Sequence, residues 1–361
     1  MSIHTVLTVV GARPQFVKAA AVSTAIASTP GLEEILVHTG QHYDEAMSGS
    51  FFDELGISPP VHNLEVGSGG HGEQTGLMMQ RLEKVVLAEQ PSCMLVYGDT
   101  NSTLAGALVA AKLHIPIAHV EAGLRSFDRA MPEEINRIVT DHVSSHLYCP
   151  SDVAVAHLLR EGVTAGVHVV GDVMYDVLRR ESAQLGTENP VAWSCGVDDY
   201  VLATLHRPGN TDNPHRLAQI LEALTALGRD GLSVIWPVHP RTRSLVAGWA
   251  RPQHVHLVTP TTYRETLALL RDARCVLTDS GGLQKEAYWM ATPCVTVRPS
   301  TEWTETVDEG WNTLVDADAL AIVDTITLAR QGDSDRLSYG NGDAAQRIVE
   351  LIPRMITDAL T

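Results

Sequence analysis

The feature that most constrains the fold is a regular alternation between short apolar runs and longer helical patterns. The first half carries HTVLTVVG (4–11), SCMLVYGD (92–99) and IPIAHVE (115–121), which are rich in β-branched residues. Strands of a parallel sheet are covered on both faces, so they read as nearly continuous apolar runs. Segments with helical periodicity separate these runs, as in GEQTGLMMQRLEKVVLAEQ (72–90). The pattern predicts an α/β fold with a doubly wound parallel sheet.

The alternation pauses and then restarts. A mixed stretch over 177–195 combines a helical pattern with turn-forming glycine, asparagine and proline residues. Strand-like runs then resume, as in YVLATLH (200–206) and RCVLTDS (274–280). Since 361 residues suffice for two domains of ordinary size, we expect Rossmann-like domains over 1–176 and 177–342. Two such domains facing each other would leave a cleft, a common place for a ligand.

The composition of the chain excludes several classes of binding partner. The chain carries 26 Lys and Arg against 43 Asp and Glu, a net charge of −17. This argues against a nucleic-acid or anionic-membrane surface, because such surfaces need a basic footprint. The five cysteines are widely spaced and form no CxxC, which argues against a zinc site or a disulfide framework. With no signal-peptide pattern and no apolar run of membrane-spanning length, we expect a cytoplasmic enzyme without a metal.

One short window, 96–137, concentrates charged residues. Asp99 and Glu121 each follow an apolar run that is predicted to be a strand. Ligands of open α/β sheets bind at the carboxyl ends of the strands, so two acids at two such ends suggest acid/base chemistry. Glu133 and Glu134 begin a helix, where acids also complement the helix dipole. The two side chains cannot point the same way, so we expect at most one to face a ligand.

Two strand-to-helix junctions have the chemistry of anion sites. GARPQFVK (11–18) places Arg13 and Lys18 around a helix N-terminus, although a helix started by proline with surface cations explains it equally well. LTDSGGLQKE (277–286) offers a serine hydroxyl and two glycines before a helix, an arrangement suited to a diphosphate. The alternative there is a capped tight turn. The elbow pattern GxSxG is absent, which argues against a nucleophilic serine.

Histidines stand at further strand ends. His206 and His239 follow two consecutive strands of the second half, and His42 lies in HTGQHYD (38–44) after a strand of the first half. A single histidine is more often structural than catalytic, but two at strand ends of one predicted cleft favour a functional role.

Together these motifs resemble the non-hydrolysing UDP-N-acetylglucosamine 2-epimerase family. The matching pieces, in the family's order, are GARPQFVK, TGQHYD, VYGDTNSTL, HVEAGLRS, MPEEINR, HR, PVHP and LTDSGGLQKEA. The resemblance implies a GT-B fold, in which two Rossmann-like domains face each other across a cleft and the second binds UDP. It also implies that the final helix, about 343–361, packs back onto the first domain, and that the protein is a homodimer without a cofactor.

The implied chemistry is the interconversion of UDP-GlcNAc and UDP-ManNAc. C2 of the sugar has no adjacent carbonyl, so its proton is not acidic enough for direct removal. The family instead eliminates UDP across C1–C2 to give a 2-acetamidoglucal, and UDP adds back with protonation of C2 from the other face. Elimination needs a base, an acid for the return step, and cations that hold the diphosphate.

The resemblance also implies roles for individual residues. Its acid/base and charge-stabilising candidates are Asp99, Glu121, Glu133 and His206. Its substrate-binding candidates for phosphates and sugar are Arg13, Lys18, His42, Arg137 and His239, while Ser280, Gly281 and Gly282 would bind the diphosphate and Glu286 the ribose.

One segment departs from the commoner family pattern. STEWTET carries Trp303 where many members have an arginine, and it resembles a branch with TEW motifs. That branch includes enzymes acting on UDP-GlcNAc and others acting on UDP-2,3-diacetamido-2,3-dideoxy-glucuronic acid. The second substrate is therefore an alternative.

Three further functions compete with the epimerase. A GT-B glycosyltransferase would leave the acids of the 96–137 window unexplained. A hydrolysing 2-epimerase would release free N-acetylmannosamine, and a nucleotide-sugar sensor would need no acids at all.

Overall fold

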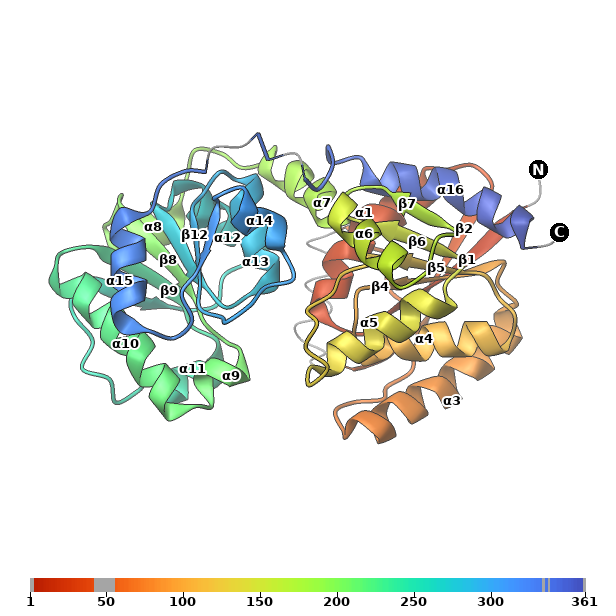
Figure 1. Ribbon diagram of the computed structural model, residues 1–361, viewed down its shortest axis with the longest axis horizontal. Helices are drawn as coiled ribbons and strands as arrows, with labels where there is room; N and C mark the ends of the chain where they lie inside the picture. The colour runs from red at the N-terminus through yellow and green to blue at the C-terminus, as the bar shows by residue number, and fades with distance from the viewer. Residues whose placement is uncertain (1–2, 42–55, 333–334, 337, 360–361) are drawn as a thin grey trace. The chain divides into compact units, whose positions relative to one another are not determined.

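A computed structural model describes residues 3–41, 56–332, 335–336 and 338–359. The chain divides into two compact units, one made of Met1–Arg179 with Ser338–Thr361 and the other of Arg180–Leu337 (Figure 1). The domain boundaries expected from the sequence, at residues 176 and 342, remain predictions. No helix in the described ranges combines the length and apolar character needed to cross a bilayer.

The first unit contains, within its described residues, a seven-stranded parallel sheet in the order β3-β2-β1-β4-β5-β6-β7. Its strands are β1 (His4–Val10), β2 (Leu32–His38), β3 (His62–Asn63), β4 (Cys93–Tyr97), β5 (Ile117–Val120), β6 (His146–Cys149) and β7 (Val167–Val169). Its helices are α1 (Arg13–Ala27), α3 (His71–Glu89), α4 (Asn101–Lys112), α5 (Pro132–Val143), α6 (Asp152–Arg160) and α16 (Ala344–Asp358), with α7 (Val173–Ser182) running into the second unit.

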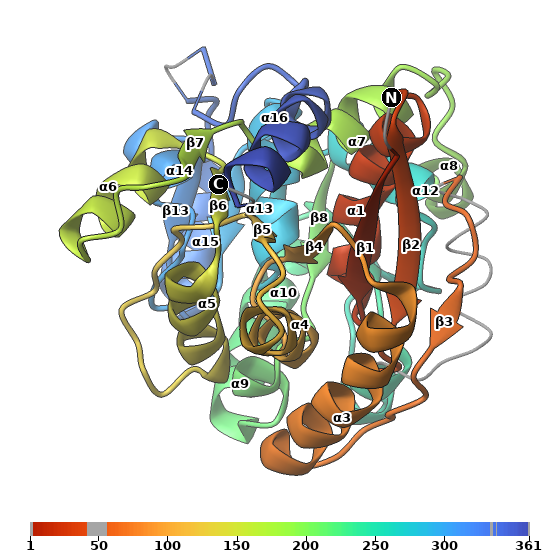
Figure 2. The ribbon, with the colours of Figure 1, turned by 90° about the vertical axis from the view of Figure 1, so that its right-hand side faces the viewer.

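Helices cover both faces of the first sheet. Helix α1 packs against the C-terminal helix α16 on one face, and α3, α4 and α5 pack side by side on the other (Figure 2). Between the sheet and the second group lies an apolar core that includes Leu7, Val9, Met94 and Val96. Burial on both faces explains why these strands are continuous apolar runs.

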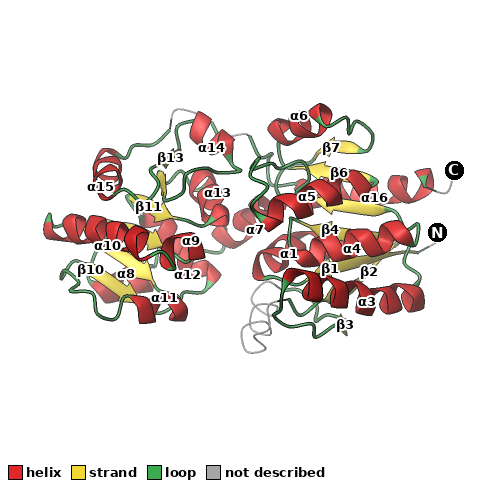
Figure 3. Cartoon of the chain, turned by 60° about the horizontal axis from the view of Figure 1, so that its bottom comes forward, coloured by secondary structure: helices red, strands yellow, loops and turns green. Residues whose placement is uncertain are grey.

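The second unit contains, in the described part of the chain, a six-stranded parallel sheet in the order β10-β9-β8-β11-β12-β13. Its strands are β8 (Tyr200–Thr204), β9 (Ser233–Pro237), β10 (Val255–Val258), β11 (Cys275–Thr278), β12 (Cys294–Thr296) and β13 (Asn312–Leu314). Its helices are α8 (Pro190–Cys195), α9 (Pro208–Thr211), α10 (Pro214–Arg229), α11 (Pro240–Leu245), α12 (Tyr263–Asp272), α13 (Gly281–Trp289), α14 (Thr304–Asp308) and α15 (Ala319–Leu328). Figure 3 shows helices flanking the strands of each unit.

Alternate residues of β8 supply two separate cores. Val201 and Ala203 face a cluster with α10 and α15, whereas Tyr200 and Leu202 face a cluster with α8, α12 and α13. This alternation follows from the two-residue period of a strand. The predicted pair of doubly wound parallel sheets is confirmed.

The polarity of the sheets positions the candidate residues. Because all strands of a sheet run the same way, the ends of β4 and β5 lie at one edge of the first sheet, and the ends of β8 and β11 at one edge of the second. The turns after these strands carry the acids and histidines singled out in the sequence.

Candidate active site

Each of the two strand-end acids of the first unit contacts a cation. Asp99 follows β4 and Glu121 follows the neighbouring strand β5. The Lys18 ammonium, on α1, lies 2.6 Å from Glu121 Oε1. The Arg137 guanidinium, on α5, lies 2.6 Å from Asp99 Oδ2. The fold therefore brings four of the predicted site residues into two ion pairs on adjacent strand ends.

The two ion pairs differ in exposure. The Lys18 and Glu121 side chains are 9% and 7% exposed, so this pair is almost removed from water. The Asp99 side chain is 30% exposed, although its partner Arg137 is buried. A buried charge needs its partner, since removing one member of such a pair leaves the other unpaired at a cost of about 3–5 kcal/mol. Asp99 is accordingly the more accessible carboxylate of the two.

The backbone around these acids is unusual. Glu121 has a φ of 71°, in the left-handed region that non-glycine residues rarely adopt. The N–H groups of Glu121 and Ala122 both donate to the Tyr148 carbonyl at 3.1 Å, which holds this turn in place. Gly98 has a φ of 63°, which favours glycine, and a Cβ there would make a tight contact of 3.1 Å with the Lys18 ammonium. Strained backbone of this kind clusters at functional sites.

The neighbouring acids of α5 point in different directions, as the sequence analysis expected. Glu133 is exposed, whereas Glu134 is only 1% exposed. The Glu134 carboxylate accepts from the N–H groups of Ser126 and Phe127 at 2.9 and 3.0 Å and lies 3.1 Å from Arg137. Glu134 thus anchors a loop, and Glu133 is the acid of this pair that a ligand can reach.

A residue that the sequence analysis missed also supports the site. The Asn136 side chain donates to the Asp99 carbonyl at 2.9 Å. Asn136 and Arg137 therefore hold the backbone and the side chain of Asp99 from consecutive positions of α5. The motif MPEEINR contains both residues, but only the three-dimensional structure shows what the asparagine contacts.

In the second unit, a buried carboxylate organises the turn after β8. Asp279 is fully buried and accepts from the N–H groups of His206 and Arg207 at 3.1 and 3.0 Å, and from the Asn210 amide at 3.1 Å. His206 Nδ1 lies 3.3 Å from the Asp279 carboxylate, while the His206 side chain is 51% exposed. The carboxylate thereby fixes the position of the turn and orients an exposed imidazole.

The predicted Ser-Gly-Gly junction begins helix α13. Ser280 is the N-cap residue, and its hydroxyl accepts from the Leu283 N–H at 3.5 Å. A Cβ at Gly281 would lie 3.2 Å from the Trp303 indole nitrogen and 3.8 Å from Arg207 Nη2. Gly282 follows as the second residue of the helix. The junction therefore combines backbone donors with an indole N–H and a guanidinium, a donor set suited to an anion.

Two further polar residues lie on helix α13. Glu286 is 7% exposed, and its carboxylate adds to the effect of burial in raising the pKa of Tyr263 well above its usual value. Lys285 is 1% exposed, and its ammonium lies 3.7 Å from the centre of the Trp303 ring. This buried cation–π contact carries no signal of its own in the sequence. It places Trp303, the residue that departs from the commoner family pattern, against the helix of the Ser-Gly-Gly junction.

For the remaining predicted residues, the structure gives a position in the fold. Arg13 is the first residue of α1, as expected for the GARPQFVK junction. His239 is exposed and directly precedes α11, where its carbonyl accepts from the Arg243 N–H at 2.9 Å. His42 lies outside the described residues.

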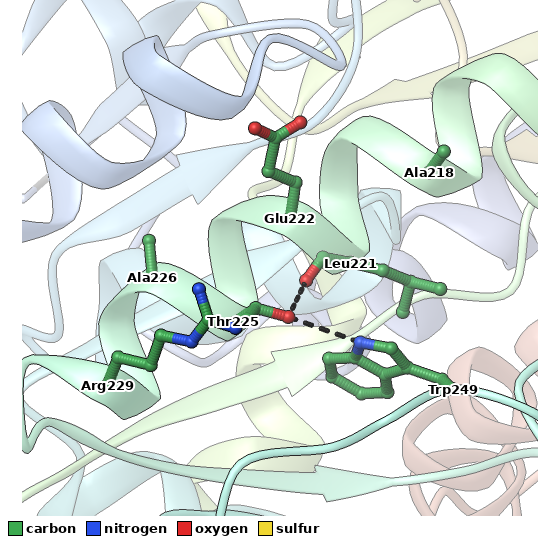
Figure 4. A pocket seen from close by; sticks show the side chains of 7 residues that line it. All are labelled: Ala218, Leu221, Glu222, Thr225, Ala226, Arg229 and Trp249. Atoms are coloured by element: carbon green, nitrogen blue, oxygen red, sulfur yellow. Dashed lines mark hydrogen bonds between the residues drawn. The ribbon is translucent and has the colours of Figure 1, made fainter.

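A hollow on the second unit is a separate feature. It has a volume of about 490 Å³ and is lined by α10 and Trp249 (Figure 4). Thr225 accepts from the Trp249 indole at 3.1 Å and donates to the Leu221 carbonyl at 2.7 Å, as Figure 4 shows. None of the predicted site residues lines this hollow.

In the described part of the chain, no group of three His, Cys, Asp or Glu residues is placed to hold a metal ion.

Comparison with known proteins places this geometry in a family. The profile described as UDP-N-acetylglucosamine 2-epimerase matches residues 24–353. A UDP-2,3-diacetamido-2,3-dideoxy-D-glucuronate 2-epimerase of Pseudomonas aeruginosa is 47% identical over 359 residues, covering 97% of this chain and 99% of the relative. A UDP-N-acetylglucosamine 2-epimerase of Methanocaldococcus jannaschii is 41% identical, covering 95% and 97% of the two chains.

A solved structure agrees with these sequence matches. The crystal structure of Methanocaldococcus jannaschii UDP-GlcNAc 2-epimerase in complex with UDP-GlcNAc and UDP has a TM-score of 0.87 at 39% identity and covers 98% of this chain and 100% of that chain. This likeness confirms the predicted GT-B type of fold.

Proposed function

We propose a substrate and a mechanism for this chain, which belongs to the UDP-N-acetylglucosamine 2-epimerase family. It is a nucleotide-sugar 2-epimerase. The substrate that we propose is UDP-GlcNAc, which the enzyme interconverts with UDP-ManNAc. The observation that carries the acid/base chemistry is the pair of cation-bound carboxylates, Glu121 with Lys18 and Asp99 with Arg137, at adjacent strand ends. The choice of UDP-GlcNAc is supported by the Methanocaldococcus jannaschii relative.

The proposed reaction is an elimination followed by re-addition. A carboxylate takes the C2 proton as the C1–O bond to UDP breaks, which leaves a 2-acetamidoglucal and UDP. UDP then re-forms the C1–O bond while C2 receives a proton on the opposite face. Atoms balance without an oxidant, because both bonding electrons of the C1–O bond leave with UDP and return with it.

The roles of individual residues follow from their surroundings. Asp99, Glu121 and Glu133 supply the acid and the base, and Asp99 and Glu133 are the more exposed of the three. His206, oriented by Asp279, is the fourth candidate. The backbone donors at Ser280, Gly281 and Gly282 bind the diphosphate. Arg13, His42 and His239 remain candidates for phosphate or sugar contacts, as does Glu286 for the ribose.

A second substrate is supported by a specific comparison. The 47% identical Pseudomonas aeruginosa relative is a UDP-2,3-diacetamido-2,3-dideoxy-D-glucuronate 2-epimerase. Trp303 fits the TEW branch that we propose for this chain, and that branch includes both activities. UDP-diacetamido-glucuronate is therefore the second candidate.

Proton NMR in D₂O separates these alternatives. The enzyme is incubated with each nucleotide sugar in parallel, and C2 deuteration and product identity are followed. C2-deuterated UDP-GlcNAc and UDP-ManNAc at equilibrium support our proposal, whereas deuteration of the diacetamido-uronate alone supports the second candidate. Free N-acetylmannosamine would indicate a hydrolysing enzyme, and no exchange with either nucleotide would contradict both proposals.

We also propose a homodimer, which sedimentation equilibrium tests directly.

A further inference from the structure

A buried histidine lies behind both strand-end acids. His119 is on β5, two residues before Glu121, and its side chain has no solvent exposure. Its Nε2 lies 2.8 Å from the Gly98 carbonyl, the group that forms the peptide bond to Asp99. Its Nδ1 lies 2.7 Å from Asp141 Oδ1, on α5. The ring therefore connects the turn that carries Asp99 to the helix that carries Arg137 and Asn136.

The partners of the ring determine its protonation. A backbone carbonyl has no proton, so Nε2 must donate to Gly98. Nδ1 faces a carboxylate, which accepts when it is ionised. With acceptors at both nitrogens, the ring needs a proton on each, and the residue is then an imidazolium.

The surroundings of Asp141 keep its carboxylate ionised. Asp141 Oδ2 accepts from Arg125 at 2.7 Å and from the Gly123 N–H at 3.1 Å. Burial alone would raise the pKa of the Asp141 carboxyl, but the hydrogen bonds and charges of His119 and Arg125 lower it. Arg125 also pairs with Glu161 at 2.7 Å. His119, Asp141 and Arg125 thus form a buried network that reaches the surface at Glu161, where His142 Nδ1 lies 3.9 Å from the carboxylate.

We propose that His119 is a positioning residue, which fixes the turns of Asp99 and Glu121 by donating from Nε2 to the Gly98 carbonyl and from Nδ1 to the Asp141 carboxylate. On one side, His119 holds the peptide plane before Asp99. On the other, Asp141 holds the Gly123 N–H, two residues after Glu121. The catalytic consequence of this proposal rests on the proposed function, in which the two acids react with substrate, but the protonation state does not.

Histidine-selective ¹⁵N NMR of the full-length protein tests the protonation state. The His119 signals are identified by their absence in His119→Gln. We expect both ring nitrogens of the wild-type protein to carry a hydrogen-bonded proton at pH ~7, because each faces an acceptor. In Asp141→Asn the carboxylate acceptor is gone, so the Nδ1 signal should change while the Nε2–H donor to Gly98 is retained. A single protonated nitrogen in the wild-type protein at pH ~7 would overturn the proposal, as would an unchanged Nδ1 signal in Asp141→Asn.

Kinetics test the positioning role. A displaced catalytic group costs rate rather than affinity, so His119→Gln should lower kcat about 10–100-fold and leave UDP affinity within about 3-fold. The control is His215→Gln, at an exposed histidine on α10 of the second unit, which should retain the wild-type rate. Wild-type kcat in His119→Gln, or a loss confined to UDP affinity, would contradict the role. If the wild-type protein fails to deuterate its substrate while the NMR result holds, the proposed function fails and the assignment of the imidazolium stands.

Discussion

The carboxylates at the strand ends have different kinds of hydrogen-bond partner in the two units. In the first unit, Asp99 and Glu121 each contact a side-chain cation, Arg137 and Lys18. In the second unit, Asp279 accepts mainly from backbone N–H groups of the turn after the neighbouring strand β8. An ion pair can exchange a partner for a proton or a substrate charge, whereas a carboxylate locked onto backbone amides acts as a fixed anchor. This difference assigns chemistry to the first unit and ligand holding to the second in our proposal.

The largest expected effect comes from the strand-end acids. Asp99→Asn or Glu121→Gln removes a proton-transfer group, so C2 deuteration should fall about 1,000-fold. UDP affinity, measured by calorimetry, should stay within about 3-fold, because the diphosphate donors at Ser280 and Gly281 are unchanged. Near wild-type turnover in either variant would remove that residue from the mechanism.

Breaking the buried pair should destabilise the protein. Lys18→Met removes the cation that lies 2.6 Å from the buried Glu121 carboxylate, and we expect a loss of about 3–5 kcal/mol in the free energy of unfolding. All six tryptophans lie in the second unit, so tryptophan fluorescence follows that unit while circular dichroism follows both. The loss should appear in the dichroism transition, and the exposed Lys112→Met is the matched control. Equal stability of the two variants would show that the buried pair contributes nothing.

The Ser-Gly-Gly junction should govern affinity instead. In Gly281→Val, the new side chain meets the Trp303 indole, since even a Cβ would lie 3.2 Å from its nitrogen. Loss of one or two charge-assisted hydrogen bonds should weaken UDP binding about 10–100-fold. Gly248→Val, at an exposed glycine with open space around it, serves as the control. Calorimetry with UDP measures both, and wild-type affinity in Gly281→Val would place the diphosphate elsewhere.

A smaller expected effect is a pH dependence of the stability of the first unit. Burial raises the pKa of Asp176 to about 6, although the N–H groups of Ala344 and Ala345 at the start of α16 oppose this shift. The folded state therefore binds more protons than the unfolded state between pH ~4 and ~6, and stability falls as pH rises through that window. We expect a loss of about 2 kcal/mol across it.

The variant Asp176→Asn tests this pH dependence. The substitution should flatten the stability profile between pH ~4 and ~6 in urea unfolding followed by circular dichroism. The control Asp318→Asn changes the exposed N-cap of α15 in the second unit and should leave the slope of the first unit intact. An unchanged slope in Asp176→Asn would show that another group titrates there.

The sequence predicted the sheets well because parallel strands are long apolar runs. It did not predict β3 (His62–Asn63), since two residues carry no periodicity. The acid turns were predicted from their position after strands, but the His119 network was not. His119 reaches Gly98 only because Val96 pairs with His119 across β4 and β5, and Asp141 lies on a separate helix. The sequence signal was present, as a histidine inside the apolar run IPIAHVE, yet its partners depend on strand register.

The central claim is that the first unit supplies the acid/base carboxylates and the second holds the nucleotide. The most direct measurement is C2 deuteration in D₂O at saturating substrate, with Glu121→Gln and Gly281→Val compared side by side. Our account predicts exchange about 1,000-fold slower in Glu121→Gln and close to wild type in Gly281→Val once the substrate concentration exceeds its KM. Slow exchange in saturated Gly281→Val, with normal exchange in Glu121→Gln, would contradict the account.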